Sequence, residues 1–149
     1  MGSFNLSPIV WVFLVFIFTV AALTWSMRQG DGAPRPRGLF FLAALPGLLA
    51  ILTFSSLAIH MHFSLGGWPD FYGTEGVSQA LITHAELAYM MFTIAILAGF
   101  SMPLVAALFA LVPRLRSSAV YPSFCGVVCW LCLFMTALAP AGFQRWWWD

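Results

Sequence analysis

The sequence predicts an all-α membrane protein, an antiparallel up-down-up-down bundle of four transmembrane helices that forms a single domain over residues 1–149. Hydrophobic residues make up 62% of the chain and charged residues only 7%. A soluble domain of this length could not hide so much apolar surface, because a small domain leaves a large share of its surface facing water. The apolar residues also gather in four long blocks, which indicates that lipid surrounds most of the chain.

We expect the helices at about residues 8–26, 39–62, 79–112 and 119–140. A helix that crosses a hydrocarbon core of about 30 Å needs about 20 apolar residues. The third block is longer than one untilted crossing, so its last turns should leave the membrane, with a bend near Pro103. Barrel strands are excluded because they alternate polar and apolar residues, whereas the segment from Trp11 to Phe18 is continuously apolar.

The few charged residues predict which helix ends face the cytoplasm. The first-to-second and third-to-fourth links carry five of the six arginines, whereas the second-to-third link carries two acidic residues and no base. Positive residues in short loops stay on the cytoplasmic side. We therefore expect a multi-pass protein in contact with the lipid bilayer, with both termini in the periplasm. The bacterial inner membrane is the location that we assign to it, and this assignment does not follow from the charges.

Small residues and tryptophans predict where the helices meet other surfaces. The pairs Gly47-x-x-Ala50 and Ser123-x-x-Gly126 should let helix backbones approach closely. Tryptophans near helix ends suit the headgroup zone, where the ring is buried and the N–H is hydrated. A second reading makes some of them a surface for partner subunits or a pigment; these candidates are Trp68, Trp146, Trp147 and Trp148.

The three histidines form the one group of residues that suggests chemistry. His60 and His62 close the second expected helix, and His84 and Glu86 open the third, so antiparallel helices would bring them to one membrane level. Ionisable side chains within membrane segments are costly and point to function. Two cofactor hypotheses follow, a b-type haem with axial ligands His60 and His84, and a copper or zinc ion held by His60, His62, His84 and Glu86.

Helix geometry weighs against a single metal site. About 200° of rotation separates His60 from His62 if the helix stays regular, because a helix has 3.6 residues per turn. The alternative is that these side chains hydrogen-bond backbone carbonyls near the membrane interface and hold no cofactor, and that Glu86 complements the dipole of its helix.

Other catalytic signatures are missing from the sequence. It has no nucleophile elbow, no phosphate-binding loop, no lysine and no basic face for nucleic acid. We expect an accessory or structural subunit of a larger membrane complex, of respiratory, photosynthetic or monooxygenase type, with other integral-membrane subunits as partners and no enzymatic activity. The alternative is a small redox or metal-binding membrane protein that uses the histidines, and a small-solute carrier is a third candidate.

Overall fold

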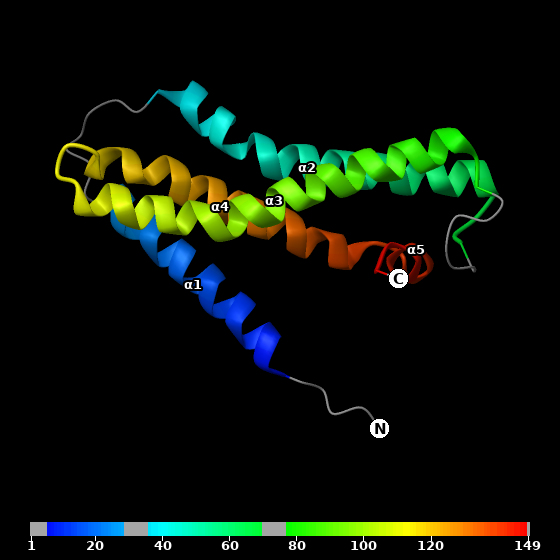
Figure 1. Cartoon of the computed structure of the whole chain (residues 1–149), viewed down its shortest axis with the longest axis horizontal. Helices are drawn as coiled ribbons and strands as arrows, with labels where there is room; N and C mark the ends of the chain where they lie inside the picture. The colour runs from blue at the N-terminus through cyan, green and yellow to red at the C-terminus, as the bar shows by residue number, and fades with distance from the viewer. Residues whose placement is uncertain (1–5, 29–35, 70–76, 149) are drawn as a thin grey trace. The chain divides into compact units, whose positions relative to one another are not determined.

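The computed structural model describes residues 6–28, 36–69 and 77–148, with side chains from Val12 onward. Within these ranges the chain is helical and contains no strand. The two 3-10 helices flank the fourth α-helix (Figure 1). In chain order the elements are α1 Leu6–Arg28, α2 Arg37–Leu65, α3 Gln79–Leu111, η1 Arg116–Ala119, α4 Val120–Met135, η2 Thr136–Leu138 and α5 Ala141–Trp148.

Three helical stretches of the described residues are long and apolar enough to cross a membrane. They are α2, α3 and the segment Arg116–Leu138, which contains α4. The prediction of an all-helical protein is therefore confirmed for the described residues, and the length and composition of these three stretches suit a membrane. The part of α1 with described side chains, Val12–Arg28, is shorter than these three stretches, so a fourth crossing and the antiparallel order of four helices stay predictions.

The helix ends match the expected bounds except after the fourth helix. Both α2 and α3 continue through an internal proline, Pro46 and Pro103. The helix expected to reach residue 140 instead ends at Met135 and continues as η2. Pro140 explains the break, because proline disfavours the α conformation of the residue before it, and Ala139 is extended, with ψ at 154°.

The helices form two compact units. Unit 1 consists of Met1–Ala44 and Ala98–Val127, and unit 2 consists of Leu45–Leu97 and Val128–Asp149. The division falls inside α2, α3 and α4, so each of these helices contributes one part to each unit.

Small residues and an aromatic group on α2 and α4 help to hold unit 1 together. A side chain at Gly126 in α4 would lie 2.9 Å from the Thr19 methyl carbon of α1, so the missing side chain permits this close approach, as expected from the sequence. Thr19 is buried, and its hydroxyl donates to the Val15 carbonyl of its own helix. The Phe40 ring of α2 packs against Tyr121 and Phe124 of α4, with ring centroids 5.0 and 5.2 Å apart.

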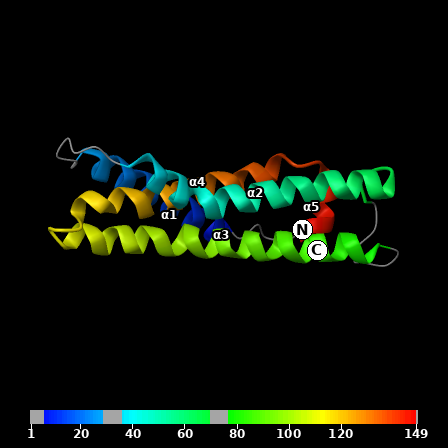
Figure 2. The same ribbon diagram turned by 90° about the horizontal axis from the view of Figure 1, so that it is seen from above.

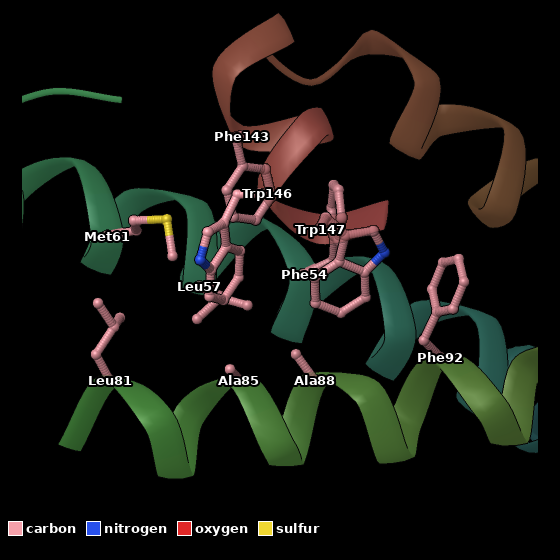
Figure 3. Close-up of a cluster of buried hydrophobic side chains, with 10 residues drawn as sticks. All are labelled: Phe54, Leu57, Met61, Leu81, Ala85, Ala88, Phe92, Phe143, Trp146 and Trp147. Atoms are coloured by element: carbon pink, nitrogen blue, oxygen red, sulfur yellow. The ribbon is translucent and has the colours of Figure 1, made fainter. Parts of the chain in front are cut away.

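Unit 2 has a buried hydrophobic core between α2, α3 and α5 (Figure 3). Phe54 of α2 and Phe92 of α3 stack with their centroids 6.5 Å apart, while further along Met61 and Leu81 belong to the same core. The two helices therefore run in opposite directions within this unit. α5 lies along one side of this helix pair (Figure 1), and its contacts to both helices close the core. Gly47 meets the α4 backbone closely, because a side chain there would lie 3.1 Å from the Cys129 nitrogen.

Candidate functional site

His60 of α2 and His84 of α3 contact each other directly in unit 2. Their Nδ1 atoms are 3.0 Å apart, and their ring centroids are 5.3 Å apart. Both side chains are half-buried. The sequence prediction that antiparallel helices bring these two residues to one level agrees with this contact.

A serine hydroxyl extends this contact into a chain of hydrogen bonds and identifies the tautomers. Ser56 lies one helical turn before His60 and donates its only hydroxyl proton to the Thr53 carbonyl, at 3.0 Å. The Ser56 oxygen therefore accepts from His84 Nε2, at 2.9 Å. A neutral imidazole carries one N–H and one lone pair, so His84 Nδ1 accepts and His60 Nδ1 donates.

This order of bonds leaves the Nε2 lone pair of His60 available. Within the described residues no hydrogen bond reaches this atom. A histidine that holds one ring proton in a hydrogen bond and offers its other nitrogen has the arrangement that metal-binding histidines use. Protonation of both rings is incompatible with the pair, because two N–H donors cannot share one hydrogen bond.

His62 and Glu86 do not join this pair. The helix stays regular to Leu65, so the rotation expected between His60 and His62 is present. The His62 ring packs on the Trp68 indole, with centroids 4.5 Å apart, and its Nδ1 is buried without a hydrogen bond. Glu86 is exposed. Among the residues that the structure describes, no three His, Cys, Asp or Glu side chains gather as a metal site.

The haem hypothesis meets a geometric obstacle of its own. Two axial imidazoles must lie on opposite faces of a porphyrin, with the iron between their nitrogens. His60 and His84 instead hydrogen-bond each other across 3.0 Å. A porphyrin would have to separate the rings and break the bond from His84 to Ser56.

The terminal tryptophans are divided between core and surface. Trp146 and Trp147 are buried, the latter with only 2% of its surface exposed, and both belong to the core of unit 2 (Figure 3). Trp147 lies flat on the Tyr89 ring, with centroids 4.1 Å apart, while the Tyr89 hydroxyl donates to the Trp147 carbonyl at 2.7 Å. The short helix α5 turns these residues inward. Only Trp148 and Trp68 of the four candidates remain exposed, at 62% and 40%.

Sequence reasoning missed Ser56, Tyr89 and the helix that carries the tryptophans. A signal for that helix was present, since proline is common at helix starts and the Pro140 carbonyl accepts the first bond of α5, from the Gln144 N–H. Nothing in the sequence around Ser56 indicates its contact with His84, because the two residues are 28 positions apart.

Comparison with known proteins finds no relative of this chain. No family model, no curated protein and no solved structure matches this chain.

Proposed function

We propose that this chain is an accessory subunit of a larger bacterial integral-membrane complex, of respiratory, photosynthetic or monooxygenase type, which it stabilises by helix and aromatic packing. One observation carries the proposal. Only 28% of the apolar part of α2 and 22% of that of α3 is buried inside the chain. These helices therefore keep most of their apolar surface for lipid or for the helices of other subunits.

The histidine pair is consistent with a structural role. A hydrogen bond between two polar side chains links neighbouring membrane helices, because each would otherwise be left unpaired in an apolar environment. His60, His84 and Ser56 satisfy one another in this way. The pair then fixes α2 against α3 in unit 2 and needs no bound group.

Purification from native membranes tests this function. The tagged chain, expressed from its own locus and extracted in mild detergent, should migrate well above its own 16.4 kDa and should contain partner subunits in a fixed ratio. Migration of the chain alone would contradict the proposal.

A second experiment tests whether the exposed tryptophans contact partner subunits. Replacing Trp68 and Trp148 with alanine should release the chain from its complex without changing its helix content. Leu111→Ala is the matched control, because Leu111 is a similarly exposed apolar residue in unit 1. Release by the control but not by the tryptophan variant would assign the partner surface to unit 1 instead.

We further propose four antiparallel crossings of the inner membrane, with both termini periplasmic. The charge distribution supports this orientation. Five of the six arginines lie at or in the connections from α1 to α2 and from α3 to α4, whereas the connection from α2 to α3 carries two acidic residues and no base. Positive residues favour the cytoplasmic side.

Single cysteines introduced into a variant without native cysteines test the orientation. A membrane-impermeant maleimide should label Gly67→Cys in intact spheroplasts, and the site is suitable because no atom lies within 4 Å of a side chain placed there. Arg114→Cys, on the exposed α3–η1 connection, should be labelled only after permeabilisation. The opposite pattern would invert the topology.

The second candidate function is a small redox or metal-binding protein. The available Nε2 of His60 favours it, because the Nδ1 proton is already held by His84. Copper or zinc added to the purified chain should then bind with a fixed number of ions per chain. His60→Gln should abolish this binding, and His62→Gln should leave it unchanged. A Soret band lost in His60→Ala would instead indicate haem, and neither signal in the wild-type chain would reject this function.

A further inference from the structure

Unit 1 contains an apolar pocket beside its basic end. The pocket has a volume of about 290 Å³ and lies between α1, α3, η1 and the start of α4. Its walls combine two aromatic rings with residues whose side chains are too short to fill it. The main lining residues are Phe18, Trp25, Ala107, Ala110, Ala119 and Ser123.

The serine in the pocket lining has no hydroxyl proton left to donate to a ligand. The Ser123 hydroxyl donates to the Ala119 carbonyl at 2.9 Å and is buried, so its proton is already used. The alanines contribute only methyl groups. A hydrocarbon chain fits these walls, whereas a polar ligand would lose hydrogen bonds on entry.

An arginine is fixed at the rim of this pocket. Arg116 Nε donates to the Ala110 carbonyl at 3.2 Å, and Ala110 itself lines the pocket. That carbonyl lies in the last turn of α3, where the helix supplies no N–H donor for it. The bond uses one of the five guanidinium N–H groups and leaves the two terminal NH₂ groups for an anion.

A second arginine lies on the same end of unit 1. Arg28 follows Trp25 by three residues on α1, so the two share one side of the helix. α1 contacts η1, which begins with Arg116, and both ribbon views place the end of α1 beside the α3–α4 connection (Figures 1 and 2). In the described part of unit 1 no carboxylate is present to neutralise these arginines.

We propose that unit 1 binds one anionic phospholipid, with an acyl chain in the apolar pocket and the phosphate against Arg116 and Arg28. Guanidinium groups suit phosphate because they are always charged and present paired donors. Basic sites between membrane helices on the cytoplasmic side bind such headgroups. This inference is independent of the accessory-subunit proposal, because it concerns a lipid and not a protein partner.

Native mass spectrometry of the full chain in mild detergent tests the site. Phosphatidylglycerol and phosphatidylcholine with identical acyl chains are added in equal amounts, and the lipid that remains bound is counted. We expect one phosphatidylglycerol to be retained in preference to phosphatidylcholine. Arg116→Gln should lower this preference about fivefold, since one arginine near a charged surface contributes on the order of 1 kcal/mol. Arg145→Gln, in unit 2, is the matched control and should leave it unchanged.

The pocket is tested separately from the charge. Ala107→Leu should reduce the retention of both lipids, because its larger side chain occupies the space of the acyl chain. Leu108→Phe adds bulk at the neighbouring exposed position and should have no effect. Arg116→Lys keeps the charge and should keep most of the preference. Circular dichroism and a monodisperse elution profile establish that each variant is folded.

Three results would overturn this site. One is equal retention of the two lipids by the wild-type chain. Another is undiminished retention by Ala107→Leu. The third is displacement of phosphatidylglycerol by an equal concentration of glycerol 3-phosphate, which would show a phosphate site without a role for the acyl chain.

Discussion

The aromatic core of unit 2 provides the most quantitative prediction, the cost of Trp147→Ala. The Trp147 ring stacks on Tyr89 at 4.1 Å and meets Phe54 and Phe92 edge-on at 5.1 and 5.5 Å. Each such pair contributes about 1 kcal/mol beyond the area it buries. The area term itself is weak in detergent, where the surroundings are also apolar. The three pairs together predict a loss of about 3 kcal/mol in the docking of α5.

Trp148→Ala is the matched control for this change. Trp148 is the same residue type at the next position, but it is mostly exposed and has one comparable contact, with Phe92 at 5.6 Å. Its replacement should cost about 1 kcal/mol. The comparison separates packing inside unit 2 from any general effect of removing a tryptophan near the membrane surface.

Hydrogen–deuterium exchange over residues 141–148 measures this docking, because amides of a docked helix exchange when it opens locally. In mild detergent, the α5 amides of Trp147→Ala should exchange about 100-fold faster than those of the wild type, with the rate of a free peptide as the upper limit. The same amides of Trp148→Ala should exchange about fivefold faster than those of the wild type. Equal acceleration by the two variants would refute the reasoning, and so would wild-type exchange in Trp147→Ala.

Two further predictions concern helix contacts in each unit. Gly126→Ala should destabilise unit 1 by about 1 to 3 kcal/mol, because the new side chain would lie 2.9 Å from Thr19. Thermal unfolding should detect this loss of stability. Gly38→Ala is the control and should cause no loss, because no atom lies within 4 Å of a side chain placed there. In unit 2, both imidazoles should be neutral, and ¹⁵N NMR should find the single ring proton on Nδ1 in His60 and on Nε2 in His84, as the order of hydrogen bonds requires. Detection of both rings as the Nε2–H tautomer would contradict that order.

Hydrophobic pattern and glycine spacing predicted the elements well, for physical reasons visible in particular residues. A long apolar run in lipid has the helix as its main solution, which is why α2 and α3 end within three residues of the expected bounds. Gly47 and Gly126 lie at close contacts, as small residues in membrane helices should. Such signals involve residues that are close together in the sequence, so the sequence alone is enough to recognise them.

The site was predicted less completely because it depends on long-range packing. The level shared by His60 and His84 follows from antiparallel helices, but the orientation of Ser56 toward His84 depends on how the helices rotate about their axes. The C-terminal tryptophans suggested a surface because their run is typical of interfacial anchors. Trp147 is buried instead, since α5 turns it toward Tyr89.

The interleaving of the two units has a consequence for biosynthesis. Phe92 is synthesised 55 residues before its core partner Trp147, so at about 5 to 20 residues per second roughly 3 to 11 s pass before Trp147 is added. During that interval the core residues of α2 and α3 that α5 later contacts are open to lipid or to an insertion chaperone. The core that contains both residues therefore closes only after the ribosome has completed the intervening part of unit 1.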